Sequence, residues 1–131
     1  MPNILVVDDD KLIRWSLSEI FSQEGCQVDT VATVSEALEH AKDKTYQLIL
    51  ADVEISNEDG IGMLVRIKKD QPTSTIIILS AFPKSKIEPL LKSLKIFCII
   101  EKPFQAEDIR DKGKEAIRFL NTKARDVEGH S

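Results

Sequence analysis

The stretch ILVVDDD at residues 4–10 places four apolar residues directly before three aspartates. Three further runs are apolar almost without interruption: LILA at 48–51, IIIL at 76–79 and FCII at 97–100. Strands of this kind are buried on both faces, as in a parallel sheet that is covered by helices. A fifth segment at 27–31 mixes polar and apolar residues and fits an edge strand. These runs predict a sheet of five strands with a buried centre.

Helical patterns separate these strands. Apolar residues recur at helical spacing, or follow a helix-start signal, in four segments: 11–24, 33–41, 60–67 and 109–120. A further short helix is expected to begin near Glu88 or Pro89, because proline is accepted in the first turn of a helix but not in its interior. The alternation of strand and helix predicts an α/β fold, with right-handed crossovers and a parallel sheet between two layers of helices.

Composition and charge narrow the function classes. The 131 residues are 42% hydrophobic and 31% charged, so the chain can bury a core and is expected to form one domain. The net charge of −4 argues against general nucleic-acid binding, which needs a basic face. No apolar run approaches the roughly 20 residues of a membrane span, and the first residues do not form a signal peptide. We therefore expect no direct contact with membrane or nucleic acid.

The cysteines and histidines carry no metal-site pattern. Cys26 and Cys98 stand apart, without a partner at metal-ligand spacing. We expect two buried, reduced thiols and hence a reducing, cytoplasmic setting. His40 and His130 are also isolated, so no zinc site is predicted.

Polar side chains follow four of the five predicted strands. Asp8 and Asp9 come directly after the first run, Asp52 after the run at 48–51, Ser80 after the run at 76–79, and Lys102 one residue beyond the last run. In open α/β sheets, ligands bind beyond the carboxyl ends of the strands. A single aspartate after a strand is usually a turn or capping residue. Four such strand ends together predict a functional site at this edge of the sheet.

These side chains suit phosphoryl chemistry. Carboxylates that lie close together repel one another, so they hold protons or recruit a cation. Mg²⁺ prefers octahedral oxygen coordination by one or two carboxylates, waters and a phosphate. Beside such an ion an aspartate can stay ionised and attack phosphorus, and Lys102 and Ser80 can stabilise the group in transfer.

The ordered motifs resemble the receiver domain of bacterial two-component response regulators. The matching pieces are ILVVDDD at 4–10, LAD at 50–52, DG at 59–60, LSA at 79–81 and KPF at 102–104. The resemblance covers about residues 3–121, and residues 122–131 are expected to be a polar linker or tail. It implies a flavodoxin-like three-layer sandwich, with five helices around a five-stranded parallel sheet in the order 2-1-3-4-5.

The resemblance also implies a role for each matching residue. Asp52 corresponds to the residue that is phosphorylated by a sensor histidine kinase or phosphotransfer protein. Lys102 corresponds to the lysine that contacts the phosphoryl oxygens, and Ser80 occupies the Ser/Thr switch position. The implied Mg²⁺ site consists of Asp8, Asp9, Asp52 and the backbone carbonyl of Glu54.

One position departs from the family pattern. Receiver domains normally carry Tyr or Phe three residues before the lysine, and this chain carries Ile99. An aromatic side chain that moves with the Ser/Thr is therefore not expected here. The bond between Lys102 and Pro103 is usually cis in the family, and we expect the same here.

The resemblance predicts a phosphorylation-activated signalling switch that catalyses only its own phosphotransfer and dephosphorylation, and is otherwise no enzyme. The expected partners are the kinase, an output domain in the same protein or a separate effector, and a second copy on phosphorylation. The first helix is similar to that of enhancer-binding transcription activators. The alternatives are a receiver-like binding module that is never phosphorylated and a haloacid-dehalogenase-like phosphatase, which would use Asp8 as its nucleophile.

Three further residues have simpler structural explanations. Asp10 and Asp59 each precede a predicted helix and are expected to cap it. Trp15 lies off the apolar stripe of the first helix. Partial cover by neighbouring side chains is expected for Trp15, with partner docking as the alternative.

Overall fold

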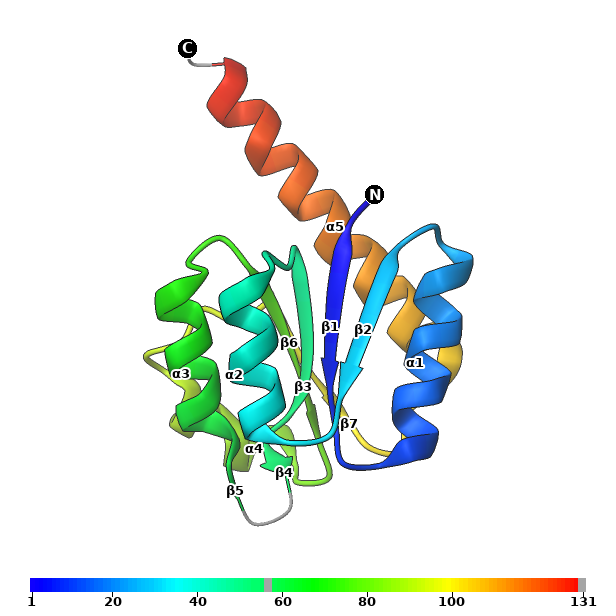
Figure 1. Cartoon of the computed structure of the whole chain (residues 1–131), viewed down its shortest axis with the longest axis vertical. Helices are drawn as coiled ribbons and strands as arrows, with labels where there is room; N and C mark the ends of the chain where they lie inside the picture. The colour runs from blue at the N-terminus through cyan, green and yellow to red at the C-terminus, as the bar shows by residue number, and fades with distance from the viewer. Residues whose placement is uncertain (56–57, 130–131) are drawn as a thin grey trace.

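The computed structural model describes residues 1–55 and 58–129, with side chains described as far as residue 119. Within these residues a parallel sheet has the strand order β2-β1-β3-β6-β7 (Figure 1). Its strands are β1 (Asn3–Val7), β2 (Gln27–Val31), β3 (Leu48–Asp52), β6 (Thr75–Ser80) and β7 (Cys98–Glu101). This is the predicted order 2-1-3-4-5, which is confirmed. A short antiparallel pair of strands, β4 (Glu54–Ile55) and β5 (Glu58–Asp59), was not predicted.

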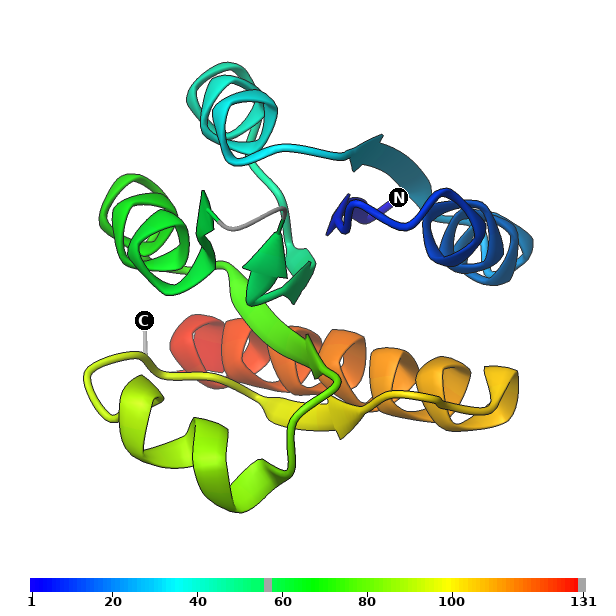
Figure 2. The same cartoon turned by 90° about the horizontal axis from the view of Figure 1, so that it is seen from below.

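Helices cover both faces of the sheet (Figure 2). One face is covered by α1 (Lys11–Gln23) and α5 (Ala106–Gly129), and the other by α2 (Val34–Asp43), α3 (Gly60–Asp70) and α4 (Lys84–Ile87). The predicted caps are confirmed. Asp10 accepts from the N–H groups of Leu12 and Ile13, and Asp59 accepts from that of Gly62.

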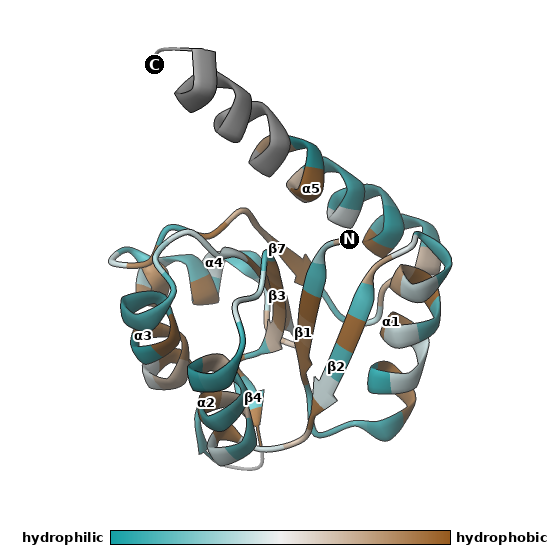
Figure 3. Cartoon of the chain, turned by 45° about the horizontal axis from the view of Figure 1, so that its top comes forward, coloured by the Kyte–Doolittle hydropathy of each residue, from teal (hydrophilic) through white to brown (hydrophobic). Residues whose placement is uncertain are grey.

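The two faces of the sheet bury separate hydrophobic cores. Successive residues of a strand point to opposite faces, so Ile4 and Val6 belong to the core under α1 and α5. Leu5 and Val7 belong to the core under the other helices. Figure 3 shows β1 as apolar along most of its length and β2 as mixed, in agreement with a buried strand beside an edge strand.

The close approach of α1 to α5 depends on Gly113. A Cβ atom at this position would lie 2.2 Å from the ring of Phe21. The glycine costs α5 about 1 kcal/mol of helix propensity relative to alanine. That cost is offset by the close packing of the two helices.

Helix α5 continues past the predicted domain end. Its backbone is helical as far as Gly129, whereas the sequence predicted a polar linker or tail over 122–131. Side chains from residue 120 onward lie outside the part that the structure describes. The domain boundary at 121 stays a prediction. In the described residues, no helix is long and apolar enough to cross a bilayer.

The start of α4 was predicted wrongly. The helix begins at Lys84 rather than near Glu88, with Pro83 at its N-cap. Proline's fixed φ suits entry into a helix, and the observed value is −58°. Pro89 lies in the first turn of the 3-10 helix η1 (Glu88–Leu91) that follows α4 directly. Since Pro89 has no N–H, it interrupts the α-helical hydrogen bonds, and the chain continues as a tighter turn.

The amino end of the sheet contains a buried polar network around Gln71. The Gln71 side chain donates to the carbonyl oxygens of Ala41 and Lys44 at 2.6 and 2.7 Å. Its Oε1 accepts from the N–H of Tyr46 at 2.8 Å, and the Ser74 hydroxyl donates to the Tyr46 carbonyl at 2.6 Å. These bonds tie the ends of α2 and α3 to the beginning of β3.

Candidate functional site

The structure brings the predicted polar residues together at the carboxyl ends of the strands. Asp8 follows β1, Asp52 ends β3, Ser80 ends β6, and Lys102 follows β7. The register of the parallel strands places these ends side by side. Asp8 and Ser80 are fully buried and Asp52 is 5% exposed. The two buried carboxylates, Asp8 and Asp52, therefore need hydrogen-bond partners or a cation.

Lys102 connects the two buried carboxylates. Its Nζ donates to Oδ2 of Asp8 and to Oδ2 of Asp52, each at 2.8 Å. The lysine side chain is 17% exposed, so these ion pairs are largely shielded from water. The ammonium group of Lys102 thus binds two aspartates that are distant in the sequence. Asp8 lies 94 positions before Lys102, and Asp52 lies 50 positions before it.

Backbone groups orient the other carboxylate oxygens. Oδ1 of Asp8 accepts from the N–H of Asp10 at 2.9 Å, and Oδ1 of Asp52 accepts from the N–H of Glu54 at 2.8 Å. Each carboxylate is therefore held from both sides. The backbone carbonyl of Glu54, predicted as a metal ligand, stays a prediction.

Arg14 is a site residue that the sequence analysis missed. Its Nη1 donates to the backbone carbonyl of Asp8 at 2.9 Å and so anchors the acidic loop to α1. Its position at the opening of the first predicted helix, six residues after Asp8, was the available signal.

Asp9 completes an acidic cluster at the exposed mouth of the site. Ligand oxygens of Asp8, Asp9 and Asp52 all lie within 4.8 Å of one another. Carboxylate oxygens are the ligands that Mg²⁺ prefers in proteins. The donor set therefore fits a hard divalent cation.

The pKa values reflect burial and pairing. Burial raises the pKa of Asp8 above its ordinary value, and the hydrogen bond from Lys102 lowers it only in part. Burial by itself would lower the pKa of Lys102, but the hydrogen bonds to Asp52 and Asp8 outweigh it and raise that pKa. Lys102 is therefore a cation that faces two carboxylates, and the site carries excess negative charge.

Ser80 is held within its own loop. Its Oγ accepts from the N–H of Phe82 at 3.0 Å. The backbone N–H of Lys102 donates to the Ser80 carbonyl at 2.7 Å, so the ends of β6 and β7 are joined. The peptide bond between Lys102 and Pro103 is cis, as predicted. Ile99 is 6% exposed and packs in the core under α4.

Two apolar side chains are exposed near the start of α1. Trp15 is 62% exposed and Leu12 is 69% exposed, and they lie three residues apart on the same side of the helix. Neighbouring side chains thus cover the smaller part of the Trp15 ring. Both cysteines are free, with Cys26 buried as predicted and Cys98 only partly buried.

Comparison with known proteins gives a family match over most of the chain. Residues 4–126 match the model of the response regulator receiver domain. Sporulation initiation phosphotransferase F of Bacillus subtilis is 34% identical over 114 residues, which cover 87% of this chain and 92% of that protein. The DNA-binding transcriptional regulator NtrC of Escherichia coli is 30% identical over 80% of this chain, which spans only 22% of NtrC.

A solved structure agrees with both sequence and fold. The response regulator protein TrrA of Thermotoga maritima, in complex with Mg²⁺ and BeF, is 31% identical and superposes with a TM-score of 0.77. The match covers 88% of this chain and 99% of TrrA.

Proposed function

The chain belongs to the response regulator receiver domain family and is a phosphorylation-activated signalling switch, and from this premise we propose that Asp52 is the phosphoryl acceptor. The observation that carries the assignment is the double ion pair of Lys102 with Asp52 and Asp8 at the buried strand ends. Asp52 belongs to the acidic cluster, and its two oxygens have different partners. We propose Asp52 rather than Asp8 because Asp52 ends the central strand β3.

The proposed reaction is a phosphoryl transfer between side chains. A carboxylate oxygen of Asp52 forms a bond to phosphorus, and the bond from phosphorus to the donor's imidazole nitrogen breaks. That nitrogen keeps the electron pair, and the product on Asp52 is an acyl phosphate. The Glu54 N–H on Oδ1 fixes the orientation of the carboxylate during the attack. Lys102 lies close enough to Oδ2 to contact the phosphoryl oxygens.

We propose Asp8, Asp9, Asp52 and the Glu54 carbonyl as the residues that hold Mg²⁺. When bound, the cation neutralises the carboxylates and the phosphoryl oxygens. Asp8 and Asp52 would supply buried carboxylate oxygens, and Asp9 would supply an exposed one. With the cation bound, the repulsion between these carboxylates and a dianionic phosphoryl group would be reduced.

Ser80 and Lys102 are the residues that we propose to couple the phosphoryl group to a conformational change. The Ser80 hydroxyl is bonded to the Phe82 N–H in the resting chain. The hydroxyl still has its own O–H to donate, and a phosphoryl oxygen is a charged acceptor that would draw it strongly. Movement of the Ser80 side chain toward the phosphoryl group would then strain its contact with the Phe82 N–H.

The phosphoryl donor in this proposal is a sensor histidine kinase or a phosphotransfer protein in the cytoplasm. Leu12 and Trp15 form an exposed apolar pair beside the site, and such pairs are frequent anchors of protein interfaces. We propose that the donor docks on this pair. The output domain or effector, and pairing of two copies on phosphorylation, belong to the same proposal.

Mass spectrometry after incubation with acetyl phosphate and Mg²⁺ tests the acceptor assignment. We expect one phosphoryl group on Asp52 in the wild type, none in Asp52→Asn, and wild-type incorporation in the capping-residue control Asp10→Ala. A phosphoryl group on Asp8 would instead indicate a haloacid-dehalogenase-like phosphatase. No incorporation from any donor would indicate a binding module that is never phosphorylated.

A further inference from the structure

Glu101 caps a helix from outside that helix. Helix α4 begins after Pro83, whose side chain cannot accept a hydrogen bond. The first N–H groups of any helix have no partner inside the helix, and a polar side chain at the N-cap usually accepts one of them. Here the N–H of Lys84 donates to Oε1 of Glu101 at 2.9 Å. The last residue of β7 therefore holds the start of α4.

Glu101 lies on the face of β7 that looks toward α4. Side chains alternate along a strand, so Glu101 shares a face with Ile99 and not with Ile100. Ile99 packs in the core under α4, whereas Ile100 packs in the core under α1 and α5. The carboxylate thus follows directly, on the same face, the position where receiver domains normally carry an aromatic residue.

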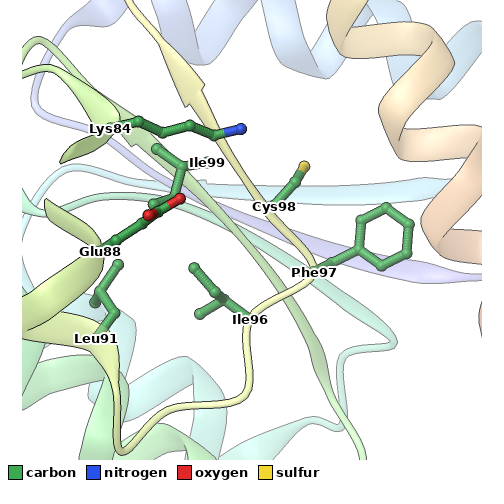
Figure 4. A pocket seen from close by; sticks show the side chains of 7 residues that line it. All are labelled: Lys84, Glu88, Leu91, Ile96, Phe97, Cys98 and Ile99. Carbon is green, nitrogen blue, oxygen red and sulfur yellow. The ribbon is translucent and has the colours of Figure 1, made fainter.

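An open pocket of about 300 Å³ separates α4 and η1 from β7 (Figure 4). Its lining consists of Lys84, Glu88, Leu91, Ile96, Phe97, Cys98 and Ile99. In Figure 4 the side chains of Glu88 and Leu91 face those of Ile96 and Ile99 across the pocket. Since Ile87 and Leu91 are buried, the helical segment is anchored along one side. The Glu101 hydrogen bond ties its first residue to the strand.

Glu101 is also directly connected to the phosphoryl site. It precedes Lys102 by one peptide bond, and the strand register pairs it with Ser80. The N–H of Lys102 donates to the Ser80 carbonyl beside it. A shift of Ser80 or Lys102 therefore reaches the Glu101 backbone without an intermediate side chain.

We propose that Glu101 is a positioning residue that couples the phosphoryl state of Asp52 to the placement of α4. This inference rests on the proposed function, because the phosphoryl group is what draws Ser80 and Lys102. In the resting chain the Glu101 carboxylate holds the start of α4 on β7. Phosphorylation displaces the ends of β6 and β7 and weakens the hydrogen bond between Glu101 and the Lys84 N–H. The start of α4 can then shift relative to β7, across the pocket between them. The carboxylate performs this coupling in a chain whose residue 99 is aliphatic.

Amide NMR spectra of the full chain, recorded with and without Mg²⁺ and beryllofluoride, test this coupling. In Glu101→Ala we expect hydrogen exchange at the Lys84 amide to become about fivefold faster, as for the loss of one hydrogen bond. The shift changes that beryllofluoride induces over 84–87 should fall well below those of the wild type. Glu101→Gln should keep most of the response, because its amide oxygen still accepts. Glu39→Ala, which removes an exposed glutamate on α2, should match the wild type.

Three outcomes would overturn the coupling. Wild-type shift changes over 84–87 in Glu101→Ala would show that α4 responds without the carboxylate. A Gln variant that behaves like the Ala variant would show that the accepting oxygen is not what matters. If the wild type itself shows no beryllofluoride response at Asp52 and Glu54, the proposed function fails, and the coupling fails with it.

Discussion

The two ends of the central sheet bury polar groups in opposite ways. At the carboxyl end, the carboxylates of Asp8 and Asp52 both pair with Lys102, and Asp9 adds a further negative charge. At the amino end, the neutral side chains of Gln71 and Ser74 pair with backbone groups of the segments around them. From Tyr46 in the amino-end network to Asp52 the chain advances six residues, which is roughly 20 Å at about 3.3 Å per residue.

This difference separates function from stability. In the described residues no buried side-chain nitrogen or oxygen lacks a hydrogen-bond partner, so neither end is unsatisfied. The carboxyl end nevertheless keeps an excess of like charge, which a cation or a phosphoryl group with its cation can relieve. The amino end has no such excess, and its bonds serve to join α2, α3 and β3. A change at the amino end should therefore alter folding alone, and a change at the carboxyl end should alter ligand response.

The largest effect is expected from removal of the Gln71 amide. Gln71→Ala leaves the carbonyls of Ala41 and Lys44 and the N–H of Tyr46 without their partner. We expect the free energy of unfolding to fall by about 3 kcal/mol, because buried unpaired polar groups cost about 1–3 kcal/mol each and water relieves part of that cost. Urea unfolding followed by circular dichroism measures the change.

The exposed glutamine Gln23 at the end of α1 supplies the control for this prediction. Gln23→Ala should change the free energy of unfolding by less than about 0.5 kcal/mol. Equal effects of the two alanine variants would mean that the Gln71 network contributes nothing beyond an ordinary surface residue.

The response to Mg²⁺ is expected to distinguish the two ends. At 100 times its Kd, a ligand that binds only the folded chain raises the free energy of unfolding by about 2.7 kcal/mol. We expect this increment in the wild type and in Gln71→Ala alike, because distant sites are additive to within about 0.5 kcal/mol. In Asp8→Asn and Asp9→Asn the increment should shrink at the same Mg²⁺ concentration.

Urea unfolding in matched Mg²⁺ and chelator buffers gives these values. The exposed aspartate Asp70 on α3 provides a matched control, and Asp70→Asn should keep the full increment. A smaller increment in Gln71→Ala would show that the network at the amino end also shapes the metal site, and would remove the contrast between the two ends.

The sequence could predict the carboxyl end because the topology alone assembles it. Parallel strands end at one edge, so a polar residue after each apolar run is enough to place Asp8, Asp52, Ser80 and Lys102 together. No side-chain geometry is needed for that step. Arg14 was missed because its partner is a backbone carbonyl, which leaves no pattern of residue types.

The amino end and α4 depend on details that a single sequence does not display. Gln71 follows a helix as many exposed residues do, and only the packing of α2 against α3 makes it a buried donor. The N–H of Lys84 at the start of α4 donates to Glu101, a residue 17 positions later on another element. Capping rules consider only residues close to the helix start in the sequence, so they do not predict a cap that comes from a distant strand.

The pH dependence of stability is expected to have opposite signs at the two ends. At the carboxyl end, burial raises the pKa of Asp8. A raised folded-state pKa contributes stability below the ordinary pKa of aspartate, and this contribution is lost as the pH rises through the folded value. Without Mg²⁺, the wild type should therefore lose stability as the pH rises toward 7, whereas Asp8→Asn should not lose this contribution. The free energy of unfolding of Asp8→Asn should rise relative to that of the wild type over this range.

Urea unfolding at a series of pH values from about 4 to 7 measures this difference. Asp70→Asn, which removes an exposed carboxylate on α3, again serves as the control. A difference for Asp8→Asn that shrinks as the pH rises would mean that Lys102 outweighs burial at the Asp8 carboxyl.

The smallest effect is expected at Asp29. This residue is linked to the network at the amino end because its carboxylate binds the hydroxyl of Tyr46, whose backbone is part of that network. The Tyr46 hydroxyl donates to Oδ2 of Asp29 at 2.6 Å, and Lys44 lies 3.1 Å from the same oxygen. The Tyr46 hydrogen bond is the main cause that lowers the pKa of Asp29, and Lys44 adds to it. A lowered folded-state pKa contributes stability above the ordinary pKa of aspartate, and this contribution is lost as the pH falls through the folded value.

Asp29→Asn should therefore lower the free energy of unfolding near neutral pH by less than about 1 kcal/mol, because the Asp29 side chain is partly exposed. The difference from the wild type should vanish in acid, opposite to the trend for Asp8→Asn. Tyr46→Phe separates the two partners, since it removes the hydroxyl and keeps the lysine. If Tyr46→Phe loses stability in acid to the same extent as the wild type, Lys44 rather than Tyr46 lowers the Asp29 pKa. The Tyr46 hydroxyl would then have no part in the pH dependence.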